Sequence, residues 1–337
     1  MKKMRKAAGN NKKGGQGIVW ALPVIAAGAW ILTSKFFVNH EQRLPDAFEA
    51  KRVVYKSKLG ANVNYYVDRK TEGRPLVLIH GVSSGASAYE MRPLFEHYRS
   101  ERPVYALELP GFGFSDRPDR VYTPQYFAET ILDFLETQVA EAVDLIALSL
   151  SCEFAARAAV SWPDAFHSLA FISPSGLGED AGGAALQLIK PGKVSENAYA
   201  ILSNRIWSQA LFDLMSVRVS LAHLYRLYFI DPVPEDLVDY AIATAHQPGA
   251  KNVPLASMSG RLSTVDVRSR FYERIQAPTQ VLFDRDPFAN FDMLPYMLGS
   301  NPSWQEVRIK PSQGMPQFEK PAETVSALDG FWHGISK

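Results

Sequence analysis

The sequence contains a single cysteine, Cys152, among its 337 residues. One cysteine cannot form a disulfide within the chain, and it cannot build a cysteine-based zinc site. The sequence also lacks a net charge, because 36 basic residues stand against 35 acidic ones. Nucleic-acid-binding domains are usually strongly basic, so this balance argues against a nucleic-acid partner. Hydrophobic residues make up 47% of the chain, which excludes a disordered protein.

The neutral total is an average over two unlike parts of the chain. Residues 1–16 carry six basic side chains and no acid, which leaves residues 17–337 with a net charge of −5. A mostly apolar run follows this tail and, interrupted only by Lys35, reaches Val38. A helix of about 20 such residues can span a bilayer. Residues 17–38 are therefore predicted to be a transmembrane anchor, with the lipid bilayer as their partner.

Two other interpretations of this segment remain open. Ala27-Gly28-Ala29 has the small-residue pattern of a signal-peptide cleavage site, and cleavage there would give a secreted protein. A buried core helix is the third interpretation, although core helices are usually amphipathic. Basic flanks tend to stay in the cytoplasm. For a single-pass anchor, the tail at residues 1–16 is thus predicted to be cytoplasmic and the globular domain extracytoplasmic.

Beyond a polar linker at residues 39–51, short apolar runs alternate with helical patterns. The runs predicted as strands lie at residues 53–56, 62–67, 75–79, 103–107, 143–148, 168–172, 280–283 and 304–309. Apolar strands separated by helices predict a mostly parallel sheet covered on both faces. Residues 176–275 are helical and aromatic-rich without clear strands. We expect them to form a helical cap inserted into one α/β core, which comprises residues 52–175 and 276–337.

A candidate nucleophile lies where the strand at residues 143–148 passes into the next helix. Ser149 is flanked there by Ala147 and Ser151, two residues away on each side. A sharp strand-to-helix turn needs small residues at these positions, and its usual form is Gly-x-Ser-x-Gly. Both glycines are replaced in this sequence, so the motif depends on its position at the end of a buried strand.

Two further motifs precede this serine. His80-Gly81 ends one predicted strand, and Glu-Leu-Pro-Gly-Phe-Gly-Phe-Ser-Asp-Arg-Pro at residues 108–118 follows the next. Together these motifs resemble the α/β-hydrolase fold superfamily over roughly residues 74–330. The resemblance is to the capped group of esterases, carbon–carbon bond hydrolases and epoxide hydrolases.

The resemblance implies roles for several residues. Ser149 matches the nucleophile, and the backbone N–H of Leu150, with that of Val82 or Ser83, would form the oxyanion hole. Asp286 matches the acid of the triad. Asp284 is the fallback, because the loop is one residue shorter than the family pattern.

The third member of the triad is missing. Aligning the segment on Pro316-Gln317-Phe318-Glu319 puts Gly314 where the family has its histidine. His333 lies deep in the predicted terminal helix and cannot replace the base by a small shift. His246 and His223 in the cap, and Glu153 one turn after the serine, are weak candidates for another base. A packing or surface role is the usual one for such residues, and His80 fits a structural role in its loop.

Two hypotheses of function follow. The first is a membrane-anchored serine hydrolase or acyl-transfer enzyme, acting through Ser149 on a small lipophilic ester-like substrate with an atypical triad. The second is a catalytically inactive pseudo-hydrolase that serves as a binding or interaction module. No metal-ligand cluster, phosphate loop or dinucleotide motif is found in the sequence, so neither a cofactor nor a metal is expected. Nothing in the sequence specifies the substrate or the oligomeric state.

Overall fold

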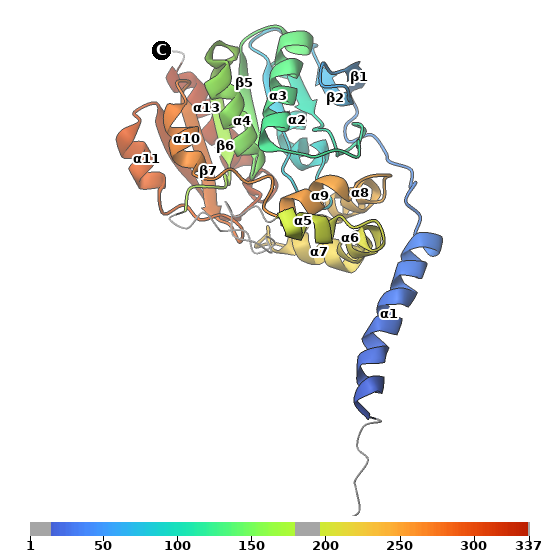
Figure 1. Ribbon diagram of the computed structural model, residues 1–337. Helices are drawn as coiled ribbons and strands as arrows, with labels where there is room; N and C mark the ends of the chain where they lie inside the picture. The colour runs from blue at the N-terminus through green and yellow to red at the C-terminus, as the bar shows by residue number, and fades with distance from the viewer. Residues whose placement is uncertain (1–14, 179–195, 336–337) are drawn as a thin grey trace, which may run out of the picture.

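The computed structural model describes residues 15–178 and 196–335, with side chains from Ile25 onward (Figure 1). All but the last two residues of the predicted cytoplasmic tail lie outside this description. The core is one eight-stranded sheet in the order β1-β2-β4-β3-β5-β6-β7-β8. Its strands are β1 (Lys51–Lys56), β2 (Asn62–Asp68), β3 (Leu76–Ile79), β4 (Val104–Leu107), β5 (Val143–Leu148), β6 (Phe166–Ile172), β7 (Thr279–Arg285) and β8 (Trp304–Gln313).

Six of these strands run parallel, and the first two form an antiparallel edge. β1 pairs antiparallel with β2, and β2 pairs antiparallel with β4, whereas every pair from β4 through to β8 is parallel. The sheet thus confirms the predicted mostly parallel arrangement. Its central strands are apolar throughout because both of their faces are covered. Val77 and Ile79 pack into one hydrophobic cluster, and their neighbours Leu76 and Leu78 pack into the other.

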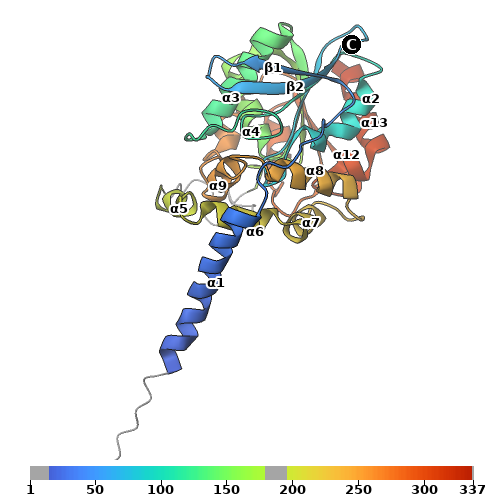
Figure 2. The same cartoon turned by 90° about the vertical axis from the view of Figure 1, so that its right-hand side faces the viewer.

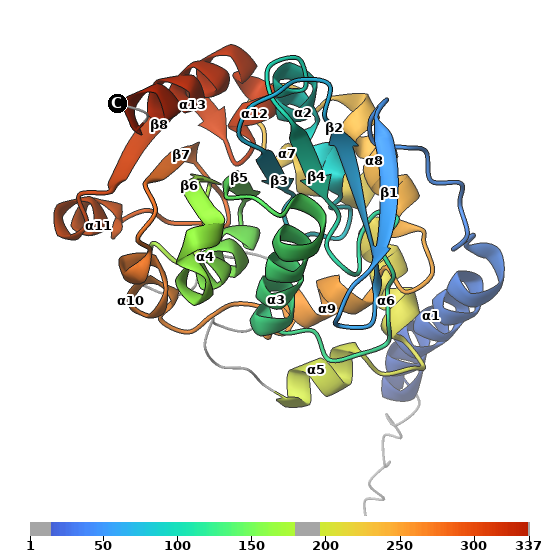
Figure 3. The same cartoon turned by 90° about the horizontal axis from the view of Figure 1, so that it is seen from above.

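Helices cover the sheet on both sides (Figure 3). On one side lie α2 (Arg92–Tyr98), α12 (Pro316–Glu319) and α13 (Pro321–Ile335), and on the other α3 (Pro124–Phe134) and α4 (Ser151–Ser161). The helix predicted over residues 88–98 is divided into the short 3-10 helix η1 (Ala88–Met91) and α2. Pro93 explains this division, because proline lacks the N–H that a helix interior needs and fits only its first turn. Likewise, α3 ends in a π-helical turn, η2 (Leu135–Val139).

Where the structure describes the chain between β6 and β7, it consists of short helices joined by turns and loops. It forms α5 (Glu196–Leu202), α6 (Ser208–Ser216), α7 (Arg218–Arg226), α8 (Glu235–Ala245), α9 (Asn252–Met258), α10 (Val267–Arg270) and the turn η4 (Tyr272–Arg274). The short helix η3 (Pro163–Ala165) precedes β6, and α11 (Leu294–Ser300) connects β7 to β8. Met215 on α6 and Pro254 on α9 line the same pocket as Ser149, which follows β5. These helices therefore lie over the carboxyl ends of the strands, where open α/β sheets bind their ligands.

Helix α1 (Gly15–Phe37) projects from the side of the protein that carries α5, α6 and α7 (Figures 1 and 2). The end of α1 nearest the globule packs against α6. Trp30 donates a hydrogen bond from Nε1 to the backbone oxygen of Ala210 (2.7 Å), and Ser34 donates from Oγ to Asp213 Oδ2 (2.5 Å). Within the described part of the chain, no helix meets the length and hydrophobicity needed to cross a membrane.

Strand β4 leads into a buried turn that is held together by Glu108. The Glu108 Oε2 atom accepts hydrogen bonds from the backbone N–H of Phe114 (2.6 Å) and from Asn64 Nδ2 (2.8 Å). Burial raises the pKa of Glu108 to about 7. Gly113 has a φ of +51°, and a methyl group on its Cα would overlap the Glu108 carboxyl group. Glycine at residue 113 is therefore required both by the backbone and by this buried group.

We expect Gly113→Ala to lower the free energy of unfolding by about 3 kcal/mol or more, because backbone strain adds to the displacement of a buried, hydrogen-bonded carboxyl group. Gly60→Ala is the matched control, since Gly60 also has a positive φ (+94°) but has open space around its Cα. Strain alone is expected there, on the order of 1–2 kcal/mol. Urea denaturation measures both variants, and equal losses would contradict the proposed role of Glu108.

Candidate functional site

Ser149 occupies a strained turn between β5 and α4. Its φ is +54°, a left-handed conformation that residues other than glycine rarely adopt. The Ser149 N–H donates a hydrogen bond to the backbone oxygen of Ile172 at the end of β6 (2.9 Å). Ser151 donates from Oγ to the backbone oxygen of His80 (2.6 Å), which ties the turn to the loop after β3. Ala147 and Ser151 are fully buried, so the turn has room only for small residues at these two positions.

A pocket of about 80 Å³ opens beside this turn. Its lining includes Ser149, Val82, Ser83 and Leu150 from the core, and Met215 and Tyr228 from the helical segment. Among the described residues, the backbone N–H groups of Val82 and Leu150 donate no hydrogen bond within the protein. Donors of this kind can stabilise negative charge that develops on a carbonyl oxygen. The structure thus brings together Ser149 and the three residues predicted to form the oxyanion hole.

Asp286, rather than Asp284, lies near this site. The Asp286 Oδ1 atom accepts hydrogen bonds from the backbone N–H groups of Phe288 (2.7 Å) and Ala289 (2.8 Å). Its Oδ2 atom is buried and has no hydrogen-bond partner in the described part of the protein. Asp284 is bound instead to Arg308, whose Nε lies 2.8 Å from Asp284 Oδ1. Burial raises the pKa of Asp286 to about 7, against the lowering effect of the two backbone N–H groups.

Gly314 lies directly beside this carboxyl group. Its N–H donates to the backbone oxygen of Arg285 (2.9 Å), and a Cβ atom built on Gly314 would stand 3.2 Å from Asp286 Oδ2. The same Cβ would overlap the aromatic ring of Tyr228. Gly314 also has a positive φ (+26°), a conformation that favours glycine. Both the backbone and Tyr228 therefore oppose a side chain at residue 314.

Tyr228 fills the space beside Asp286 but is a poor replacement for an imidazole. Its ring packs against Phe288 with the centroids 4.8 Å apart. Burial raises the pKa of the Tyr228 phenol well above its ordinary value, and the charges of Asp286 and Glu90 raise it further. A phenol in this environment keeps its proton at neutral pH, so it cannot accept one from Ser149.

None of the seven histidines lines the Ser149 pocket, and all seven lie within the described residues. His80 donates a hydrogen bond from Nδ1 to the backbone oxygen of Gly81 (2.6 Å) and accepts one at Nε2 from the N–H of Leu109 (3.1 Å). Burial lowers the pKa of His80 to about 4, so its role is structural. His246, at the end of α8, donates a hydrogen bond from Nδ1 to the backbone oxygen of Ile242 (2.8 Å). His223 is exposed on α7.

Two buried glutamates support the walls of the pocket. Glu153 accepts hydrogen bonds from Ser175 Oγ (2.5 Å) and from the N–H of Thr264 (2.7 Å). Because Ser175 lines the pocket, Glu153 helps to hold the pocket wall in place. Glu90 accepts from the N–H of Gly81 (2.9 Å) and from the Tyr225 hydroxyl (3.0 Å), and so joins the loop after β3 to α7. Burial raises the pKa of each glutamate to about 7. Sequence reasoning missed Glu90 because a glutamate in a helical pattern normally faces solvent.

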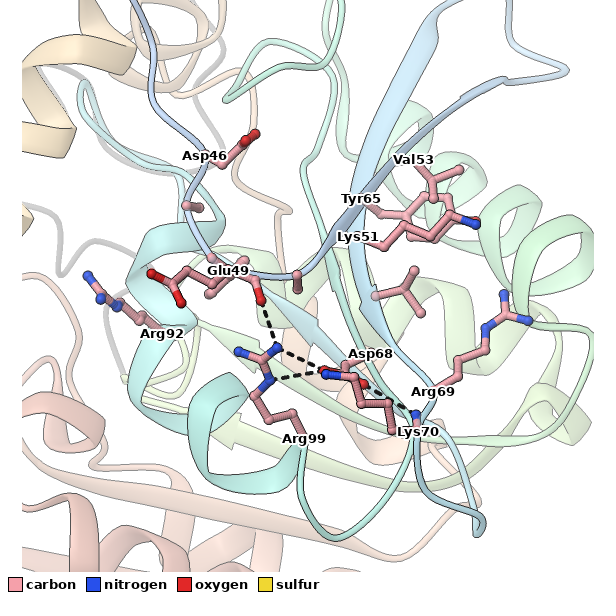
Figure 4. A pocket seen from close by; sticks show the side chains of 14 residues that line it. Asp46, Glu49, Lys51, Val53, Tyr65, Asp68, Arg69, Lys70, Arg92 and Arg99 are labelled. Carbon is pink, nitrogen blue, oxygen red and sulfur yellow. Dashed lines mark hydrogen bonds and ion pairs between the residues drawn. The ribbon is translucent and has the colours of Figure 1, made fainter.

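A second and larger hollow, of about 950 Å³, lies away from Ser149 (Figure 4). The segment around Glu49 crosses it, and β1, β2 and α2 form its other walls. Arg99 donates to Asp68 Oδ2 (2.8 Å) and to the backbone oxygen of Glu49 (2.7 Å), and Lys70 lies 3.3 Å from the same Asp68 oxygen. Several of its charges are thus already paired. No group of three or more metal-ligating side chains was found there or elsewhere among the described residues.

The raised pKa of Asp286 predicts a stability that depends on pH. Between about pH 4, where the carboxyl group ionises in the unfolded chain, and about pH 7, only the folded state keeps this proton. Raising the pH through this window therefore lowers the free energy of unfolding. Asparagine has no proton to lose, so the free energy of unfolding of Asp286→Asn should not fall for this reason. Between pH 5 and pH 8 we expect the free energy of unfolding of the variant to rise by on the order of 2 kcal/mol relative to that of the unmodified protein.

Denaturation at the two pH values measures this difference. Asp284→Asn is the control, because it breaks the pair with Arg308 and should give no such gain. An unchanged pH dependence in Asp286→Asn would contradict the assignment of a neutral, unpaired carboxyl group.

Known proteins with similar sequences and folds agree with this architecture. The chain is 34% identical over 120 residues to the uncharacterized hydrolase YugF of Bacillus subtilis, a match that covers 35% of this chain and 42% of that protein. It is 31% identical over 109 residues to the 1-acylglycerol-3-phosphate O-acyltransferase ABHD5 of Rattus norvegicus, covering 31% of this chain and 30% of that one. The chain thus spans less than half the length of these two relatives.

The fold also matches solved structures. A bacterial membrane phospholipase A, described as a virulence factor, superposes with a TM-score of 0.64 at 20% identity, covering 95% of this chain and 98% of its own. At this level of identity the likeness concerns the fold. The sequence profile of the alpha/beta hydrolase family matches residues 76–327, which is most of the chain. The protein therefore belongs to the alpha/beta hydrolase family.

Proposed function

We propose that the protein is a serine-hydrolase-type enzyme that binds a small lipophilic ester with its carbonyl carbon against Ser149. The observation that carries this proposal is the position of Ser149, in a strained turn beside a pocket that is also lined by Val82 and Leu150, whose N–H groups donate no hydrogen bond among the described residues. Met215, Met258 and Phe288 make that pocket largely apolar. An apolar pocket with a few convergent polar groups suits a lipophilic ligand.

In this proposal Ser149 Oγ attacks the ester carbon and loses its proton to solvent water, and the carbonyl oxygen becomes an oxyanion held by the two N–H groups. When the oxyanion collapses, the ester C–O bond breaks, the alcohol leaves with a proton from water, and the acyl group stays on Ser149. Each such donor typically stabilises the transition state by about 3–4 kcal/mol. The serine proton has no imidazole to receive it, because none of the seven histidines lines the pocket. Binding and the oxyanion hole alone typically retain about 10³–10⁴-fold over the uncatalysed reaction. We therefore expect slow acylation of Ser149 and slow release of the acyl group to water, rather than rapid hydrolysis.

A second candidate is a binding module without turnover. Tyr228 favours it, because its ring already occupies the space beside Asp286 and Gly314. The pocket would then hold its lipophilic ligand without cleaving it.

We further propose that residues 17–38 anchor the protein in a membrane. The sequence between Gly17 and Ser34 has no charged residue, and α1 includes it as a continuous helix. Ile25, Leu32, Phe36 and Phe37 of this helix are exposed outside the globule. The likeness of the fold to a membrane phospholipase A, and the acyltransferase name of one relative, support a lipophilic acyl ester as the substrate class.

A fluorophosphonate probe tests whether Ser149 is a nucleophile. We expect slow labelling of the folded protein that disappears in Ser149→Ala and persists in Ser175→Ala, which removes another hydroxyl group of the same pocket. Mass spectrometry of the labelled peptide identifies the site. A folded protein that remains unlabelled at Ser149 would rule out the enzyme and leave the binding module.

Rebuilding the triad tests what Tyr228 does. We expect Gly314→His alone to give no gain in ester hydrolysis, since the new side chain would overlap the Tyr228 ring. Gly314→His combined with Tyr228→Ala should raise kcat/KM by roughly 10²-fold or more, because an imidazole beside Asp286 could then accept the serine proton. Tyr228→Ala alone is the control and should stay slow. Equal activity in all three variants would refute this account of the missing base.

A further inference from the structure

Exposed apolar side chains concentrate on one side of the protein. Sixteen large hydrophobic side chains are exposed in the described part of the chain, and eleven of them belong to α1 or to residues 201–230. Single exposed hydrophobic residues are common on any protein, but a contiguous group of them marks an interaction surface. We call the group on α5, α6, α7 and their connections the outer cap face. It comprises Ile201, Ile206, Trp207, Leu214, Val217 and Val219.

Between residues 197 and 230 the exposed arginines have no exposed acidic residue among them. Asp213 is the sole acidic residue between residues 197 and 230, and it is buried. Three arginines of the same stretch, Arg205, Arg218 and Arg226, are exposed. One of them, Arg218, pairs with Asp239 of α8. An apolar surface edged with arginines is the composition that binds the interface of an anionic bilayer.

A bilayer that contains α1 would lie next to the outer cap face. The helix leaves the globule beside α6 and points away from the core (Figures 1 and 2). The side chains of Phe36 and Phe37 are still 66% and 84% exposed at the end nearest the globule. A bilayer that covers these two residues necessarily meets α6, because Trp30 and Ser34 fasten α1 to that helix.

Helix α6 also connects the outer cap face to the Ser149 pocket. Leu214 is half-exposed on the outside, and the next residue, Met215, lines the pocket. Consecutive residues of one helix thus contact the surroundings and the site. An acyl chain in the bilayer would have to pass only this layer of helices to reach Ser149.

We propose that the outer cap face is a second membrane contact, which lies in the interface of an anionic bilayer, and that the ester bound at Ser149 comes from that bilayer. This inference rests on the anchor and the serine site of the proposed function. It adds that the globular domain itself touches lipid, with Ile206 and Val219 at acyl-chain depth and the arginines at the headgroups.

Environment-sensitive labels test this contact in the full-length protein. Cys152 is fully buried, so a single introduced cysteine provides the accessible thiol for a nitrobenzoxadiazole label. Ile206→Cys and Val219→Cys place the label on the outer cap face. Val54→Cys on β1 and Val121→Cys before α3 are matched controls, because these valines are exposed on the core. Each protein is reconstituted into vesicles of phosphatidylcholine and phosphatidylglycerol, with either spin-labelled lipid or aqueous iodide as quencher.

We expect the lipid quencher to act about twofold or more strongly at residues 206 and 219 than at residues 54 and 121, and iodide to show the opposite order. Leaving out phosphatidylglycerol should weaken quenching by the lipid quencher at these two residues. Each arginine near an anionic surface raises the affinity for that surface by about fivefold.

Three results would overturn the proposal. In the first, the protein stays with the vesicles but iodide alone quenches the labels at residues 206 and 219. This result would be consistent with the anchor and would contradict the contact of the outer cap face with lipid. Labels shielded from both quenchers would point to a protein partner instead. Protein that does not associate with vesicles would remove the anchor and the cap contact together, while fluorophosphonate labelling in detergent still reports on Ser149.

Discussion

The aromatic ring of Tyr228 and a side chain at residue 314 compete for the same space beside Asp286. Most features of the site depend on this exclusion. With the ring in place, residue 314 has to be glycine, Asp286 loses its partner, and a buried carboxyl group without a partner keeps its proton near neutral pH. The same ring narrows the pocket in front of Ser149. The glycine at residue 314 and the unpartnered oxygen of Asp286 therefore both go with the position of the Tyr228 ring.

Two buried carboxyl groups, those of Glu90 and Glu153, hold the loops near Ser149 by hydrogen bonds. Glu90 binds the N–H of Gly81 and the Tyr225 hydroxyl, and Glu153 binds Ser175 and Thr264. Both carboxyl groups are buried, at 2% exposure each. Their hydrogen bonds fix the loops that shape the pocket, which suits a site built for orientation.

Local patterns predicted the core of this protein well, and nonlocal packing set the limits of prediction. The parallel strands are continuous apolar runs, and the turn at Ser149 needs small residues two positions away, so both are visible in short stretches of sequence. The absence of the histidine at Gly314 is equally local. Tyr228 and Glu90 could not be found in this way, because their positions depend on how α7 packs against the core, far from either residue along the chain. A tyrosine or a glutamate in a helical pattern does not by itself predict such a contact.

Asp213 on α6 connects this helix to α1 and to the segment that follows it. Its carboxylate accepts a hydrogen bond from Ser34 of α1 and also lies 3.0 Å from His40 Nε2, just beyond the end of that helix. Gln209, on the same face of α6, donates to it as well. A change in the tilt of α1 would therefore act as a torque on α6, whose Met215 lines the pocket. With α1 embedded in a bilayer as proposed above, the thickness of the bilayer would set the tilt of this helix and, through α6, would affect the shape of the Ser149 pocket.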